Sequence, residues 1–318
     1  MRSRVFATRR FPDRVRAELD RLFDLDVHDS EWPPSRDELL ARAAACDGLM
    51  TMLTDRIDDE LLDAAGPQLR VVANYAVGYD NVDLDACTRH QVVVSNTPDV
   101  LTQAVAELTI ALILALVRRV AEGDRLVRRR EPWIWGPNLM LGRELRSLTL
   151  GVVGYGRIGR AVEELAEAHG MRVLHTSSSG GLPLRELLAT ADVVSLHLPL
   201  SAATHHLIGE RALGLMKPSA VLVNTSRGPI VDEAALAEAL AAGRIAGAAL
   251  DVYEREPEVE ERLLALENVV LTPHLGSATL ETRKAMGMLC VEALRAVLLE
   301  GRVPANALNP EALDRKSS

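Results

Sequence analysis

The sequence has few aromatic residues and few cysteines. Aromatic side chains make up 3% of the 318 residues, so the cores must be built from alanine, valine, leucine and isoleucine. The three cysteines are Cys46, Cys87 and Cys290, and no two of them form a CxxC pair. A sparse, odd set of this kind is typical of a reducing compartment and argues against a disulfide framework or a zinc site. We therefore expect a cytoplasmic protein without a bound metal.

The chain also lacks an excess of positive charge and a long apolar run. It carries 36 Lys and Arg against 45 Asp and Glu, and this net charge of −9 disfavours nonspecific binding to nucleic acid. The longest apolar stretch, residues 108–117, has about half the length of a membrane span. The first residues alternate charged and apolar side chains, unlike a signal peptide. We expect neither a nucleic acid nor a membrane as partner.

The sequence does contain a repeated alternation of short β-branched runs with helical segments. This pattern predicts βαβ units and parallel sheets covered on both faces. At roughly 150 residues per domain, the length fits two domains. The predicted strands are 4–9, 48–54, 69–76, 92–95, 148–153, 171–176, 192–198, 220–224, 246–251 and 269–272. The predicted helices include 12–23, 58–65, 83–89, 157–169, a long one over 98–122 and a last one over 281–299 that we expect to pack on the first lobe. The fold class is therefore α/β, with two doubly wound parallel-sheet lobes.

A glycine-rich turn follows the predicted strand that starts at residue 148. In GVVGYGRIGR, Gly154 permits a tight turn, Gly156 leaves room for a pyrophosphate, and Gly159 lets the helix pack closely on the strand. The start of the following helix offers unpaired N–H groups to an anion. The pattern predicts a dinucleotide site, while a structural turn without a ligand stays open as the alternative.

The end of the next strand bears on the choice of dinucleotide. NAD sites place an acidic residue roughly 20 residues after the glycines, where it accepts a hydrogen bond from the ribose 2′-hydroxyl. Here the segment reads HTSSSGG, and Ser177 and Ser178 stand where the acid would be. These hydroxyls favour NADP(H) over NAD(H). The segment itself has no basic residue to neutralise a 2′-phosphate, and the nearest ones in the sequence are Arg157 and Arg185.

Three further residues lie in loops after predicted strands: Arg227, Glu256 and His274. Loops at the carboxyl ends of parallel strands meet at one crevice. An arginine binds a carboxylate in bidentate fashion, and a histidine beside a carboxylate can transfer a proton to a carbonyl oxygen near neutral pH. The set fits a 2-keto acid as substrate. Taken singly, each residue also fits a structural role, as an ion-pair partner, a surface charge or a buried histidine.

Several long motifs in order give the chain a family resemblance. They are residues 74–83, 96–102, the glycine turn, 224–232, 247–257 and 272–279. Over almost its whole length the chain resembles the D-isomer-specific 2-hydroxyacid dehydrogenases, and among them the glyoxylate/hydroxypyruvate reductases, also called glycerate dehydrogenases. The resemblance implies a Rossmann nucleotide-binding domain (99–284) inserted in a flavodoxin-like substrate domain (1–98 and 285–318), with the active site in the cleft. It also implies a homodimer that uses the segment 133–141.

The same resemblance implies roles for individual residues. Arg227, Glu256 and His274 would be catalytic, and Arg227 would also bind substrate together with the amides of Val77 and Gly78. The pocket wall near Leu53 would limit substrate size. Cofactor contacts would come from Thr102, Gly154, Gly156, Arg157, Ile158, Gly159, Ser177, Ser178, Thr225, Asp251, His274 and Gly276.

These residues predict an oxidoreductase that reduces a small 2-keto acid, glyoxylate or hydroxypyruvate, to the D-2-hydroxy acid with NAD(P)H. In the family that the chain resembles, NADPH-preferring reductases commonly carry an arginine where this chain has Ser178, so the resemblance does not imply a strong preference for NADP(H). One alternative is a dehydrogenase of the same family that acts on formate, phosphite or phosphoglycerate. The other is an NAD(H)-sensing binding protein. The missing regulatory extension argues against phosphoglycerate, and the missing tails argue against the sensor.

Overall fold

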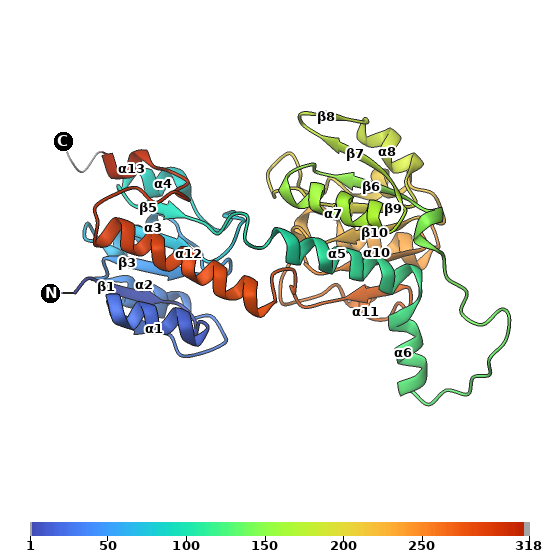
Figure 1. Ribbon diagram of the computed structural model, residues 1–318, viewed down its shortest axis with the longest axis horizontal. Helices are drawn as coiled ribbons and strands as arrows, with labels where there is room; N and C mark the ends of the chain where they lie inside the picture. Colours follow the sequence, from blue (N-terminus) through green and yellow to red (C-terminus); the bar gives the residue numbers. More distant parts are fainter. Residues whose placement is uncertain (1, 315–318) are drawn as a thin grey trace. The chain divides into compact units, whose positions relative to one another are not determined.

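The structure is a computed structural model that describes residues 2–314 (Figure 1). The chain divides into two compact units, one formed by Met1–Leu101 with Ala278–Ser318 and the other by Thr102–Ser277. Each unit contains one sheet with helices on both faces, so the predicted α/β class is confirmed. The unit limits fall at 101/102 and 277/278, whereas the sequence analysis placed domain limits at 98/99 and 284/285. Among the described residues, no helix has the length and apolar character needed to cross a membrane.

The sheet of the first unit has five parallel strands in the order β2-β1-β3-β4-β5. This order, 2-1-3-4-5, is that of flavodoxin-like folds. The strands are β1 (Arg4–Ala7), β2 (Asp24–Val27), β3 (Gly48–Thr51), β4 (Val71–Asn74) and β5 (Val93–Ser95). One face packs on α2 (Arg36–Ala43), α3 (Asp59–Ala65) and α4 (Leu84–Arg89), and α12 (Leu280–Leu298) covers the other beside α1 (Asp13–Leu22). The short α13 (Glu311–Asp314) contacts α4.

Two glycines let α12 approach its neighbours closely. A Cβ at Gly287 would lie 2.3 Å from Val15 of α1, and a Cβ at Gly48 would lie 2.9 Å from Leu294 of α12. The Tyr75 hydroxyl, just after β4, donates a hydrogen bond to the backbone carbonyl of Arg283. The last long helix of the chain thus belongs to the core of the first unit.

The sheet of the second unit has seven strands in the order β12-β11-β10-β9-β6-β7-β8. They are β6 (Thr149–Val153), β7 (Arg172–Ser177), β8 (Gly180–Gly181), β9 (Val193–Leu196), β10 (Val221–Asn224), β11 (Gly247–Leu250) and β12 (Val269–Leu271). All neighbours are parallel except β7 and β8. The sheet therefore has the Rossmann arrangement around β6, with a two-residue antiparallel strand at the β8 edge.

Helices cover both faces of this second sheet. On one face lie α5 (Thr102–Val117) and α7 (Arg157–Ala168), and on the other α8 (Leu184–Thr190), α9 (Glu210–Leu213) and α10 (Glu233–Ala241). Alternate residues of β6 supply the two cores: Leu150 and Val152 pack with α5 and α7, and Val153 packs with α8. The remaining short helices are α6 (Val120–Arg128), α11 (Glu261–Leu264), η1 (Leu145–Ser147) and η2 (Gly228–Ile230).

The structure corrects three details of the predicted elements. The single helix expected over 98–122 is wrong, because Arg119 adopts a left-handed conformation (φ 55°) that separates α5 from α6. Two elements of the first unit, β2 and α2, were not predicted. The segments that form β2 and α2 have no clear apolar run, which is why neither element was predicted. The start of α2 is marked by Ser35, whose hydroxyl accepts a hydrogen bond from the N–H of Glu38.

Candidate active site

The three predicted catalytic residues follow three neighbouring strands of the second unit. Arg227 follows β10, Glu256 follows β11 and His274 follows β12. All three strands are parallel, so their carboxyl ends share one edge of the sheet, and the loops that leave this edge lie side by side. The structure thereby brings together side chains that lie up to 47 positions apart in the sequence.

His274 and Glu256 form a direct pair. His274 Nδ1 lies 2.8 Å from Glu256 Oε2, and both side chains keep about a quarter of their surface exposed, 28% and 26%. Burial favours a raised pKa for Glu256, but the hydrogen bond and charge of His274, the N–H of Tyr253 and the charge of Arg227 outweigh it and hold this pKa below its usual value. Because an ionised Glu256 only accepts hydrogen bonds, Nδ1 donates to it, and Nε2 is the nitrogen left for chemistry.

The backbone at His274 is held in an uncommon conformation. Its φ is 55°, in the left-handed region that non-glycine residues rarely adopt. The buried carboxylate of Asp251 holds this turn: Oδ1 accepts from Leu275 N–H at 2.7 Å, and Oδ2 accepts from Gly276 N–H at 2.8 Å. The hydroxyl of Thr272 also donates to Asp251 at 2.6 Å. Asp251, predicted as a cofactor contact, thus fixes the direction of the His274 side chain in this structure.

The loop that carries Arg227 packs tightly on the loop that carries Glu256. At Gly228 a Cβ would lie 1.8 Å from the backbone of Tyr253, so only glycine permits this approach. The amide of Asn224 donates to the carbonyl of Arg227 at 2.9 Å. Because the two loops touch, the guanidinium is near enough to Glu256 for its charge to lower the pKa of that carboxyl.

The glycine turn after β6 has the geometry of a phosphate-binding turn. Gly154 has a φ of 96°, and a Cβ there would lie 2.3 Å from the carbonyl oxygen of His197. A Cβ at Gly159 would lie 2.2 Å from the carbonyl oxygen of Gly154, whereas a Cβ at Gly156 would meet nothing within 4 Å. The first and third glycines are thus required by packing, and the second leaves open space at the start of α7. These residues fit a dinucleotide.

The end of β7 carries hydroxyl groups and no acidic side chain. The hydroxyl of Ser177 donates to the carbonyl of Gly180 at 3.0 Å and accepts from Ser179 N–H at 3.3 Å, so it is engaged within the β7–β8 turn. Ser178 lies between them and is exposed. A 2′-phosphate would meet no carboxylate in this turn.

The other predicted cofactor residues lie on elements of the same unit. Arg157 and Ile158 begin α7, Thr102 begins α5, and the hydroxyl of Thr225 lies 3.0 Å from that of Thr109 on α5. A Cβ at Gly276 would lie 3.4 Å from Val105 of α5. The sequence analysis missed Thr109 and Thr272, because each acts through a contact with a residue far away in the sequence.

His197 directly follows β9, and this place in the sequence predicts that it lines the cofactor groove. Its Nε2 lies 2.8 Å from the hydroxyl of Ser195, and its buried Nδ1 has no hydrogen-bond partner among the described residues. Burial lowers the pKa of His197 to about 3, so this imidazole stays neutral. Its place in the groove stays a prediction.

The predicted substrate residues Leu53, Val77 and Gly78 belong to the first unit, in the loops after β3 and β4. The side chain of Asn96 donates to the carbonyl of Val77 at 2.8 Å, and the N–H of Thr97 donates to the carbonyl of Ala76 at 2.9 Å. In a trans peptide the N–H points away from the C=O. Holding these two carbonyls therefore turns the N–H groups of Val77 and Gly78 the opposite way. The sequence analysis did not single out Asn96.

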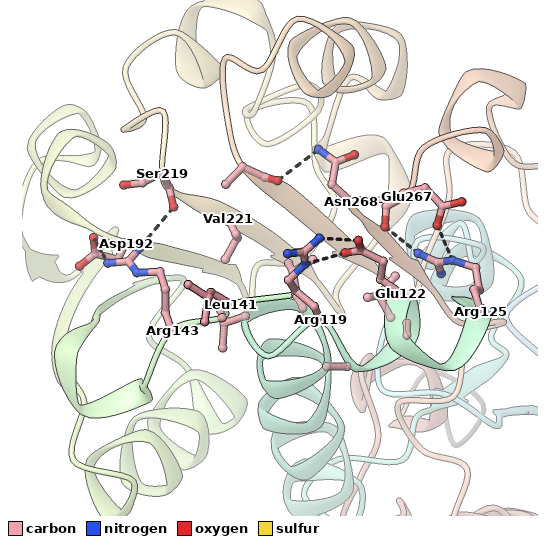
Figure 2. A pocket seen from close by; sticks show the side chains of 17 residues that line it. Arg119, Glu122, Arg125, Leu141, Arg143, Asp192, Ser219, Val221, Glu267 and Asn268 are labelled. Atoms are coloured by element: carbon pink, nitrogen blue, oxygen red, sulfur yellow. Dashed lines mark hydrogen bonds and ion pairs between the residues drawn. The ribbon is translucent and has the colours of Figure 1, made fainter. Parts of the chain in front are cut away.

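A separate cavity of about 300 Å³ lies elsewhere in the second unit (Figure 2). It opens where β10, β11 and β12 begin, whereas the predicted catalytic residues follow the ends of these strands. Its charged side chains pair with one another, as the ion pairs Arg119–Glu122 and Arg125–Glu267 show. This cavity is not the catalytic site. Within residues 2–314, no group of His, Cys, Asp and Glu side chains could hold a metal ion.

Known proteins resemble the chain in sequence and structure. A family model described as D-isomer specific 2-hydroxyacid dehydrogenase, NAD binding domain, matches residues 110–276. A glyoxylate reductase of Aeropyrum pernix is 49% identical, with 98% of this chain and 97% of that protein covered. A glyoxylate reductase of Korarchaeum cryptofilum is 46% identical, with 98% of each covered.

Solved structures agree with these relatives. The crystal structure of TT0316 protein from Thermus thermophilus has a TM-score of 0.90 and 46% identity, with 96% of this chain and 99% of that chain covered. An NADPH-dependent glyoxylate/hydroxypyruvate reductase from Sinorhizobium meliloti, solved with NADP and malonate, has a TM-score of 0.83 and 32% identity, with 98% of each chain covered. The family expected from the sequence motifs is thereby confirmed: the chain belongs to the D-isomer specific 2-hydroxyacid dehydrogenases.

Proposed function

We propose that this protein reduces glyoxylate or hydroxypyruvate to the corresponding D-2-hydroxy acid with NAD(P)H. The observation that carries the proposal is the pair of His274 and Glu256 at 2.8 Å, with Arg227 in the adjoining loop. The relatives named glyoxylate reductase support the choice of keto acid, since they match nearly the whole chain.

Each catalytic side chain has a distinct task in this proposal. Arg227 binds the substrate carboxylate and stabilises the negative charge that develops on the carbonyl oxygen. His274 gives its Nε2 proton to that oxygen, and Glu256 orients the imidazole by accepting a hydrogen bond from Nδ1. NAD(P)H, when bound by the residues named below, would supply the hydride for C2. The keto acid gains one hydride and one proton, and His274 recovers its proton from solvent.

The residues that would hold the dinucleotide are those predicted above. The N–H groups at the start of α7, with Gly154, Gly156 and Gly159, would bind the pyrophosphate, and Ser177 and Ser178 would lie near the adenosine ribose. We propose NADP(H) as the favoured cofactor because no carboxylate stands at the end of β7. In the first unit, Leu53 is proposed to limit substrate size, and the Val77 and Gly78 amides to bind a carboxylate.

Substitutions of Ser178 test the cofactor preference. Ser178→Arg adds a cation for a 2′-phosphate, so it should raise the kcat/KM ratio of NADPH over NADH about 10-fold. Ser178→Ala removes one donor and should lower the ratio. A parent enzyme that prefers NADH, or a ratio that neither substitution moves, contradicts the proposed preference.

A panel of substrates tests the reaction. We expect kcat/KM for glyoxylate or hydroxypyruvate to exceed that for pyruvate, with NADPH oxidation followed by absorbance. Turnover of formate, phosphite or phosphoglycerate instead would replace the proposed substrate while keeping the family. Cofactor binding without turnover of any of these compounds would identify a sensor and overturn the proposal.

We also propose a cytoplasmic homodimer. The loop after α6 leaves its unit as an extended segment (Figure 1), and it exposes large apolar side chains, including Ile134 and Trp135 at more than 80%. Such a patch on a soluble protein marks an association surface. Light scattering should give a mass about twice 34.6 kDa, and Ile134→Asp with Trp135→Asp should give monomers. A monomeric parent contradicts the dimer.

A further inference from the structure

A second carboxylate near the catalytic loop has no task in the mechanism above. Glu233 is the first residue of α10 and is 6% exposed. Burial raises the pKa of Glu233, and backbone N–H groups of Glu254 and Glu260 act against this rise. The carboxylates of these same two residues act in the same direction as burial. A buried carboxylate is costly, so its hydrogen bonds must account for its presence.

Those hydrogen bonds join α10 to the loop that carries Glu256. Glu233 Oε1 accepts from Glu254 N–H at 2.6 Å, and Oε2 accepts from Glu260 N–H at 3.4 Å. In return, Glu254 Oε1 accepts from the N–H of Glu233 at 2.8 Å. One buried side chain thus holds residues 254 and 260, which lie on either side of Glu256.

A third loop contributes to the same contact. His206, in the loop after β9, has its Nε2 3.2 Å from Glu254 Oε1. The backbone N–H of His206 donates to the carbonyl of Pro229, in the loop of Arg227, at 2.8 Å. The loops that follow β9, β10 and β11 are therefore tied together around Glu233 and Glu254.

Helix capping does not explain Glu233. Asp232 already caps α10, because its Oδ1 accepts from Ala235 N–H at 2.9 Å. Nor does packing alone explain it, since an apolar residue of similar volume would fill the same space without the cost of desolvating a charge. What only an acceptor side chain can do here is bind the two amides of the catalytic loop.

We propose that Glu233 is a positioning residue for Glu256: by holding both ends of the segment 254–260, it keeps the Glu256 carboxylate against His274. This inference rests on the proposed roles of Glu256 and His274. Without Glu233 the segment would lose two anchors, and the Glu256 carboxylate would spend less time within hydrogen-bond distance of the imidazole. His274 would then hold its proton less tightly.

The test follows the His274 proton directly. The ring Cε1–H signal of His274, assigned with His274→Ala, is titrated by NMR in the parent and in Glu233 variants. Glu233→Ala should lower the pKa of His274 by about one unit. Glu233→Asp retains the charge but is too short to reach both amides, so it should lower this pKa as well. Glu233→Gln retains one acceptor oxygen for one of the two amides but places a donor NH2 group against the other, so it should lower this pKa by less than Glu233→Ala does.

Turnover provides the second measurement. Glu233→Ala should lower kcat about 10- to 100-fold with an unchanged KM for the nucleotide, and Glu233→Gln, which can hold only one of the two amides, should give a kcat between those of Glu233→Ala and the parent. The combination with Glu256→Gln should lower the His274 pKa no further than Glu256→Gln alone, because the two residues act through one contact.

The outcomes separate this inference from the proposed function. A His274 titration that is the same in the parent and in Glu233→Asp overturns the positioning role, whatever happens to kcat. If Glu233→Ala does not fold, the His274 titration of Glu233→Asp tests the positioning role in its place. A parent that binds nucleotide but reduces no keto acid overturns the proposed function, while the NMR titration still tests the link between Glu233 and His274.

Discussion

Asp55 in the first unit and Glu256 in the second occupy similar places and differ in their surroundings. Both lie in loops that follow strands of parallel sheets. Asp55 is 3% exposed, and its carboxylate is used by the Thr8 hydroxyl, the Met52 N–H and the guanidinium of Arg9. One oxygen of Glu256 accepts a hydrogen bond from His274 Nδ1, and about a quarter of the Glu256 side-chain surface is exposed. The degree of exposure, and not the residue type or its place after a strand, separates a carboxylate that stabilises a loop from one that can take part in a reaction.

The largest expected effect concerns His274 in the second unit. His274→Ala should lower kcat about 10³-fold, because it removes the proposed proton donor, and should leave nucleotide affinity within a few-fold of the parent. The free energy of unfolding should change by less than about 1 kcal/mol, since the side chain is partly exposed. Steady-state kinetics and urea unfolding measure the two quantities. His205→Ala serves as the control, and a His274→Ala enzyme with normal kcat would remove the proposed acid.

The second prediction concerns the first unit, where we expect a substitution to change the free energy of unfolding. Asp55→Ala leaves the Arg9 guanidinium buried without its partner, so the free energy of unfolding should fall by about 3–5 kcal/mol. Asp29→Ala, which breaks the exposed pair with Arg10, is the matched control and should leave the urea midpoint unchanged. Equal midpoints for the two variants would show that Asp55 is not the structural carboxylate we describe.

The smallest expected effect is a pH dependence that originates at Glu256. Its pKa is lower in the folded protein than its ordinary value of 4.5, so its ionised form stabilises the fold above that pH. This contribution is lost as the pH falls through the lower native pKa. The urea midpoint of the parent should therefore exceed that of Glu256→Gln at pH 6, and the gap should close in acid. A gap that widens below pH 4.5 would reverse the sign that we assign.

Much of the fold could be predicted because it depends on local patterns. The β-branched runs of the central strands and the turn at Gly154 are properties of short segments. The break at Arg119 could not be predicted, because arginine has no preference for the left-handed conformation that separates α5 from α6. β2 was missed because half of its residues are Asp, as suits a partly exposed edge strand. Ser35 just before α2, with Glu38 three residues later, was a usable signal for the start of this helix.

In the candidate site, too, some features could be predicted from local sequence patterns and others could not. Arg227, Glu256 and His274 could be proposed as a group from their residue types and from their places after predicted strands, and the structure places them after three neighbouring strands. The contacts that orient them could not, because Asp251 with Gly276 and Glu233 with Glu254 pair a side chain with a backbone group more than twenty positions away. Backbone N–H groups are the same in every residue, so the sequence carries no mark of which amide a carboxylate will bind.

The place of α12 in the first unit has a consequence for synthesis of the protein on the ribosome. The helix covers one face of a sheet whose strands all precede the inserted unit in the sequence, and its Cys290 and Leu294 are fully buried there. That face of β3 and β4 therefore stays uncovered until residue 298 has left the exit tunnel, by which time all of Thr102–Ser277 has been translated. The inserted unit can therefore complete its own core before α12 covers the sheet of the first unit, although the strands of that sheet are synthesised earlier.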